Sequence, residues 1–261
     1  MRTVVGHHDV LWITLDTLRY DVACDRLAAG GTPNLAAHLP GGAWERRHAP
    51  GSFTYASHAA MFAGFFPTPA RPGPHPRALG LTFPGSTSLA TDAVVFDAPD
   101  LVHGFAARGY HTICIGGTGF FNLQNPLGRV LPGLFAEAHW SPELGVTHPE
   151  SPRHQVDLAL RAVAGCEADQ RVLLFVNVSA MHQPNCIFAH GATEDSPATQ
   201  GAALDAVDRE LGRLFSGLRA RGRWHCVVTS DHGTCYGEDG FVGHRLAHEV
   251  VWTVPYAEFP L

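Results

Sequence analysis

The sequence contains no lysine, because all 18 of its basic side chains are arginine. Several kinds of site depend on a lysine amine, among them P-loop nucleotide sites, Schiff-base enzymes and pyridoxal-phosphate enzymes. The missing lysine excludes all three.

Charged residues are scarce as well, at 16% of the chain, whereas hydrophobic residues make up 45%. This balance is typical of a globular protein with an extensive core, and not of a disordered chain. The formal net charge is -6, and the sequence has no run of basic residues. We therefore expect neither a nucleic acid nor a membrane as partner, but a small molecule. The oligomeric state is left open.

The sequence also lacks a long apolar run. The apolar stretch at residues 10–15 is interrupted by Asp16, well before a signal peptide or a membrane span could form. The six cysteines are widely scattered without CxxC spacing, so reduced thiols are expected. These features predict a cytoplasmic location.

Short apolar runs rich in β-branched residues predict four buried strands, at residues 10–15, 110–115, 172–178 and 226–229. Helices are predicted at residues 58–64, 100–108, 155–164 and 203–218, and residues 68–88 are expected to form an irregular surface excursion. Strands that alternate with helices predict an α/β fold, with a largely parallel central sheet and helices on both faces. The chain length fits a single domain over residues 1–261.

Polar side chains follow the predicted strands at the end where parallel sheets bind their ligands. Asp16, His182, Asp231 and His232 all lie there. A carboxylate directly after a buried strand is costly unless its charge is compensated. A helix cap or an ion pair with Arg19 explains either aspartate alone equally well. Two carboxylates and a histidine on converging strand ends, however, predict a site for Zn²⁺ or Mn²⁺.

Three motifs occur in a specific order. Residues 15–21 (LDTLRYD) come first, residues 49–58 (APGSFTYASH) follow, and residues 229–233 (TSDHG) precede 237–240 (GEDG) and the Gly243-His244 pair. Their order resembles that of the sulfatase-like enzymes of the alkaline phosphatase superfamily. The resemblance covers roughly residues 10–67 and 172–256, and between these parts it is limited to residues 109–112.

The resemblance implies an alkaline-phosphatase-like core whose C-terminal subdomain is reduced or absent. It implies a divalent metal bound by Asp16, Thr54, Asp231 and His232, with Thr54 as the nucleophile. Coordination to a cation lowers the pKa of a threonine hydroxyl and positions it for in-line attack. One ion, Zn²⁺ or Mn²⁺, is expected. A second ion is left open, because the aspartate that two-metal relatives carry shortly before His182 is missing.

Three further histidines gain roles from the resemblance. His182 and His244 match residues that contact the substrate or a second metal, and either could protonate the leaving group. His58 stands where sulfatases have an arginine, and it is expected to bind the substrate anion or to cap the helix. For His182 and His244 the alternative is an ordinary core or surface histidine. A zinc site of Cys186 and Cys235 with neighbouring histidines is a further alternative.

The function that the resemblance implies is hydrolysis of a phosphate ester or phosphonate monoester of a small metabolite through Thr54. A phosphomutase or phosphotransferase, a sulfate-ester hydrolase and a catalytically inactive metal-binding sensor are the alternatives. The sulfate reaction is disfavoured because Thr54 stands where sulfatases have a cysteine that becomes formylglycine, and because the lysines they place around the sulfate are missing.

Overall fold

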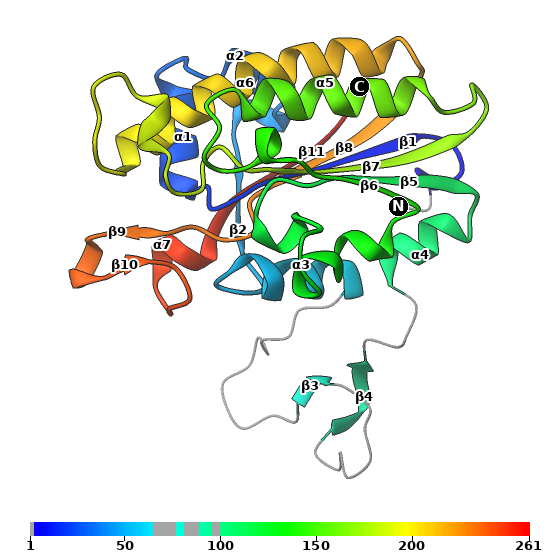
Figure 1. Cartoon of the computed structure of the whole chain (residues 1–261), viewed down its shortest axis with the longest axis horizontal. Coiled ribbons are helices and arrows are strands. Elements are labelled where there is room, and N and C mark those ends of the chain that lie inside the picture. Colours follow the sequence, from blue (N-terminus) through cyan, green and yellow to red (C-terminus); the bar gives the residue numbers. More distant parts are fainter. Residues whose placement is uncertain (1–2, 65–76, 81–88, 96–99) are drawn as a thin grey trace.

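The computed structural model of the chain describes residues 3–64, 77–80, 89–95 and 100–261. Its centre is a seven-stranded sheet with the strand order β2-β11-β8-β1-β7-β5-β6 (Figure 1). The two strand pairs that involve β11 are antiparallel, and the other pairs are parallel. The α/β fold with a largely parallel sheet is therefore confirmed.

The strands of this sheet are Asp9–Leu15 (β1), Glu45–His48 (β2), Tyr110–Ile115 (β5), Glu137–His139 (β6), Arg171–Val178 (β7), Trp224–Thr229 (β8) and Thr253–Pro260 (β11). The α-helices are Tyr20–Ala28 (α1), Pro33–Ala36 (α2), Thr54–Ala63 (α3), Leu101–Ala106 (α4), Ser151–Ala164 (α5), Pro197–Arg219 (α6) and Glu249–Trp252 (α7). Each of the four strands predicted from the sequence forms, with its ends shifted by at most a few residues.

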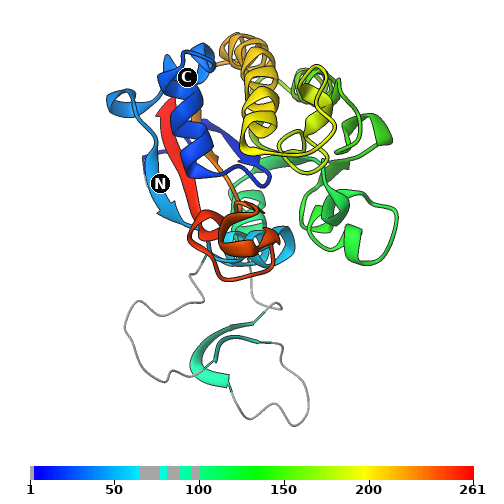
Figure 2. The ribbon, with the colours of Figure 1, turned by 90° about the vertical axis from the view of Figure 1, so that its left-hand side faces the viewer.

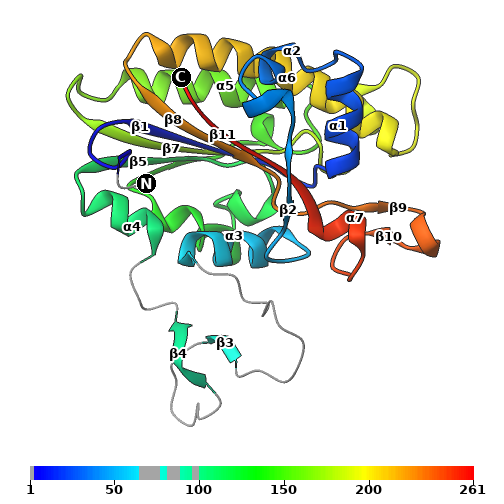
Figure 3. The same cartoon turned by 180° about the vertical axis from the view of Figure 1, so that it is seen from behind.

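Helices cover both faces of the sheet. Helices α1, α2, α5 and α6 lie on one face and α3 and α4 on the other, as Figures 2 and 3 show from two further sides. Successive side chains of a strand point to opposite faces. In β1, Leu11 joins the core beneath α5 and α6, whereas Val10 packs with Phe62 and Phe175 on the α3 side. The central strands are buried on both faces, which explains their nearly continuous apolar sequences.

Two local predictions need correction. The helix expected to begin at His58 begins at Thr54, after an extended Phe53, so Thr54 and Ser57 lie in its first turn. Of the excursion expected at residues 68–88, residues 68–76 and 81–88 lie outside the described residues. Residues 77–80 form strand β3, which pairs with β4 (Leu89–Val95), and are therefore not irregular.

The six cysteines all carry free thiols, as expected. Burial raises the pKa of the Cys114 and Cys226 thiols, which disfavours their reactive thiolate forms. Among the described helices none is long and apolar enough to cross a membrane.

Candidate active site

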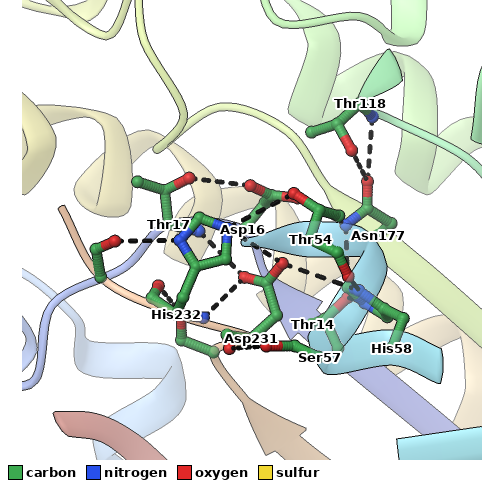
Figure 4. A network of polar contacts seen from close by, with 12 residues as sticks. Thr14, Asp16, Thr17, Thr54, Ser57, His58, Thr118, Asn177, Asp231 and His232 are labelled. Atoms are coloured by element: carbon green, nitrogen blue, oxygen red, sulfur yellow. Dashed lines mark hydrogen bonds and ion pairs between the residues drawn. The ribbon is translucent and has the colours of Figure 1, made fainter. Parts of the chain in front are cut away.

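The carboxyl ends of the adjacent strands β1 and β8 bring three titratable side chains together (Figure 4). Asp16 directly follows β1, and Asp231 and His232 follow β8 in a bend. All three residues are completely buried. One ligand atom from each lies within 4.8 Å of the others. The structure thus places the predicted metal ligands in one cluster, although they come from distant parts of the sequence.

The side chain of Thr54 also lies at this cluster. Its Oγ1 lies 3.3 Å from Nε2 of His232 and 3.5 Å from Oδ2 of Asp16. Thr54 is the first residue of α3, and the Ser57 hydroxyl one turn later donates a 2.7 Å hydrogen bond to the backbone carbonyl of Asp231. The start of α3 is therefore fixed directly to the loop that carries two of the predicted ligands.

Glycine is required where the chain passes closest to these elements. A Cβ at Gly51 would lie 2.9 Å from the backbone nitrogen of Ser57, and one at Gly233 would lie 2.0 Å from the carbonyl oxygen of Val250. Gly233 also donates a 2.6 Å backbone hydrogen bond to Val251 in α7. A side chain at either glycine would move the loop that carries a site residue.

The two buried carboxylates have different proton affinities. Burial and then the charge of Asp16 raise the pKa of Asp231 to about 7. Burial also opposes the ionisation of Asp16, but His182 and His232, together with the hydrogen bonds from Asn177 and Thr17, outweigh it, and the pKa of Asp16 falls below its ordinary value. Burial lowers the pKa of His232, which favours its neutral, metal-binding form.

The cluster fits a divalent cation. Oδ2 of Asp231 is buried and makes no hydrogen bond within the described residues, an arrangement that is rare and costly for a carboxylate. A cation held by Asp16, Thr54, Asp231 and His232 would give this oxygen a partner and relieve the repulsion between the carboxylates. Oxygen donors with one imidazole suit Zn²⁺ or Mn²⁺.

Thr17 orients both carboxylates. Its backbone N–H donates to Oδ1 of Asp231 at 3.1 Å, and its hydroxyl donates to Oδ1 of Asp16 at 2.8 Å. To do so, Thr17 adopts a left-handed conformation with φ of 68°. This conformation is costly for a β-branched residue and occurs mostly at functional sites.

Asn177, near the end of β7, supports Asp16 and was missed by the sequence analysis. Its Nδ2 donates to Oδ2 of Asp16 at 3.0 Å, while its Oδ1 accepts from the backbone N–H and the hydroxyl of Thr118, at 2.9 and 3.1 Å. Asn177 is completely buried. The sequence signal that could have identified Asn177 is that it is the one amide in the otherwise apolar run at residues 172–178.

His58 lies beneath the cluster and not on its open side. The ring is completely buried, with Nδ1 2.7 Å from the carbonyl oxygen of Thr54 and Nε2 3.0 Å from Oγ1 of Thr14. Its Nδ1 is also 3.6 Å from Oδ2 of Asp231. This position corrects the expected contact with a substrate anion, because the ring is enclosed by protein. It supports Thr54 and Asp231 from behind instead.

His182 and His244 lie next to the cluster, with His244 between His182 and His232. The ring centroid of His244 lies 4.5 Å from that of His232 and 5.6 Å from that of His182. Both His182 and His244 are partly exposed, unlike His232. Burial, followed by the charges of the other two histidines, lowers the pKa of His244 to about 4. Cys186 and Cys235 are not among the clustered ligand atoms found in the described part of the chain.

We expect Asn177→Ala to weaken metal binding by about 10- to 100-fold, because Asp16 loses the amide that orients it. Metal titration followed by calorimetry measures this change. Asn34→Ala, which removes an amide that donates to Asp208 of α6, is the matched control and should bind as the parent does. Equal affinity of the parent and Asn177→Ala would show that the amide does not orient a ligand.

We expect metal affinity to fall as the pH drops below about 7, since a proton then occupies Asp231 and must leave when the ion binds. The pKa of this group is raised in the folded protein, so proton competition acts below the folded value and disappears above it. The expected slope is roughly tenfold in affinity per pH unit. Calorimetry between pH 5.5 and 8.5 in several buffers, which also counts released protons, checks this expectation. A flat profile would contradict it.

No family model matches the sequence, and no curated protein matches it either. Solved structures do match. The C-terminal periplasmic domain of phosphoethanolamine transferase EptC from Campylobacter jejuni is 12% identical, with a TM-score of 0.63 over 98% of this chain and 82% of that one. The C-terminal periplasmic domain of EcEptC from Escherichia coli, in complex with Zn, is 12% identical, with a TM-score of 0.61 over 98% and 74% of the two chains.

The expected cytoplasmic location is contradicted by these comparisons, because both similar structures are periplasmic domains. The prediction was drawn from the lack of an apolar segment, which says nothing about the compartment in which a domain folds. A protein of the alkaline phosphatase superfamily from Vibrio parahaemolyticus is also similar, at 17% identity and a TM-score of 0.59 over 98% of this chain and 61% of that one. At such identities the comparisons establish the fold, which is alkaline-phosphatase-like.

Proposed function

We propose that the chain is a metal-dependent enzyme that transfers a phospho group from a phosphate ester through a covalent intermediate on Thr54. The observation that carries this proposal is the position of the Thr54 hydroxyl, within 3.5 Å of both Asp16 and His232. A metal-binding sensor has no need of a hydroxyl at that point, and so the inactive alternative is disfavoured.

The reaction has two in-line displacements at phosphorus. First, Oγ1 of Thr54 bonds to phosphorus while the bond to the leaving-group oxygen breaks. Then an acceptor oxygen bonds to the same phosphorus and releases Thr54. A bound divalent cation supplies the charge that lowers the pKa of the hydroxyl and neutralises the phosphate oxygens. Thr54 is the first residue of α3, whose N-terminal backbone N–H groups favour a negatively charged group there.

The two outer histidines receive different roles in this proposal. With its pKa lowered to about 4, His244 is neutral near pH 7 and suits hydrogen bonding to a phosphate oxygen. His182 is partly exposed, and its Nδ1 is fixed 2.7 Å from the carbonyl oxygen of Gln183. We assign to His182 the proton transfer to and from the departing and entering oxygens.

Group transfer to an acceptor is favoured over hydrolysis of a small metabolite. The similar structure from Campylobacter jejuni is described as a phosphoethanolamine transferase, which is a transfer enzyme and not a hydrolase. The zinc complex of the Escherichia coli domain favours Zn²⁺ over Mn²⁺.

We expect Thr54→Ala to lower turnover by at least about 10³-fold, because the covalent step is lost while most metal ligands remain. Thr54→Ser keeps a hydroxyl and is the matched control, with partial activity expected. Intact-mass spectrometry after incubation with p-nitrophenyl phosphate should show a phosphorylated species in the parent and none in Thr54→Ala. Turnover of Thr54→Ala within tenfold of the parent would remove Thr54 as the nucleophile.

We expect a transferase to release more p-nitrophenol than inorganic phosphate when an alcohol is added, because the phospho-threonine then passes its group to that alcohol. The ratio is measured with ethanolamine or glycerol at increasing concentration. A ratio of one throughout, with normal turnover, would favour hydrolysis instead. Parallel assays with bis-p-nitrophenyl phosphate and a sulfate ester test the expected preference for phosphorus.

A further inference from the structure

A short hairpin carries His244 to the candidate active site. It consists of β9 (Cys235–Tyr236) and β10 (Val242–Gly243), joined by a turn at residues 238–240. Figures 1 and 3 show this hairpin beyond the end of the main sheet, apart from the central layers. Polar contacts with the neighbouring loops help to fix its position.

These contacts come from the loops that carry the other site residues. Gln183 and Asn185, beside His182, donate hydrogen bonds to Oγ1 of Thr234 at 3.1 Å and to the Tyr236 hydroxyl at 2.8 Å. At the far end of the hairpin, the backbone N–H of Arg245 donates to the carbonyl of Ser52 at 2.8 Å, just before Thr54.

The loop after Asp16 makes a further contact through Arg19, in addition to the 3.2 Å ion pair between His248 and Asp239 in the hairpin turn. Its side chain is only 5% exposed, and its Nη1 forms an ion pair with Oε1 of Glu238. Its Nε and Nη2 are held by both oxygens of Asp21, at 2.9 and 2.5 Å. The backbone N–H of Arg19 donates to Oε1 of the buried Gln200 at 3.2 Å. Nε2 of the same Gln200 donates to the carbonyl of Thr17 at 2.9 Å, so the backbone of this loop is held at two points. The Arg19 guanidinium is thus held between Asp21 and Glu238.

Glu238 connects Arg19 to the hairpin. One carboxylate oxygen binds Arg19, and the other accepts a 2.6 Å hydrogen bond from the backbone N–H of Tyr236 in β9. The hairpin returns from Glu238 through β10 to His244. Because a planar guanidinium with two carboxylates has few alternative geometries, the position of Glu238 restricts that of the whole hairpin.

We propose that the ion pair between Arg19 and Glu238 is a positioning contact that holds His244 beside His232 and His182. The expected effect of this ion pair on turnover rests on the proposed function, whereas its expected effect on the position of the hairpin does not. Among the described residues Glu238 hydrogen-bonds to Arg19 and Tyr236, and not to the predicted metal ligands or Thr54, so it acts through His244 and not on the substrate.

Glu238→Gln is the test variant, because it removes the charge but leaves Arg19 paired with Asp21, and so the fold should survive. Glu210→Gln is the matched control, since it makes the same change in an ion pair with Arg213 on α6. Hydrogen exchange followed by mass spectrometry should show at least about tenfold faster exchange of residues 234–246 in Glu238→Gln, and no change in Glu210→Gln. Unchanged exchange of the hairpin would overturn the proposal.

The catalytic arm uses p-nitrophenyl phosphate and the metal-loaded enzyme. Misplacement of one group is expected to lower kcat by about 10- to 100-fold in Glu238→Gln, with unchanged metal content. When Glu238→Gln is added to His244→Ala, kcat should fall no further. Glu238→Asp, which keeps the carboxylate, should have a higher kcat than Glu238→Gln. Full additivity of the Glu238 and His244 changes would overturn the proposal. If the parent itself shows no turnover, the proposed function fails, and the hydrogen-exchange arm still decides the positioning role.

Discussion

Two buried carboxylates that face each other are the constraint on which the site depends. Asp16 and Asp231 are both removed from water, and the charge of Asp16 raises the cost of charging Asp231. The fold brings them together because parallel strands β1 and β8 are neighbours and end at the same edge. A divalent cation resolves this conflict, and metal-binding energy would then be part of the folding energy.

The surrounding polar groups can be understood as fixing these charges before any ligand arrives. Thr17 and Asn177 donate to the carboxylates, while Ser57 and His58 connect the start of α3 to the loop of Asp231. Such partners limit the rearrangement needed when an ion or a phosphate binds. The same principle extends to the hairpin of His244, which each neighbouring loop contacts once or more.

The sequence predicted the strands well because buried parallel strands leave long apolar runs with a polar residue where they end. Asp16, Asp231 and His232 were found for that reason. The antiparallel strand β11 was not predicted, because its position depends on pairing with β8 and β2 and not on a local pattern. Asn177 was missed because it lies within an apolar run. The burial of His58 was missed because the start of α3 was placed one turn too late.

The contact between Gly233 and α7 has a consequence for the order in which the protein matures. The loop of Asp231 is held by the backbone of Val251, and Thr17 and Asp231 are 214 residues apart in the chain. During synthesis, Asp16 emerges from the ribosome long before the segment that holds Asp231 and His232. The complete cluster can therefore form only after the segment at α7 has been translated.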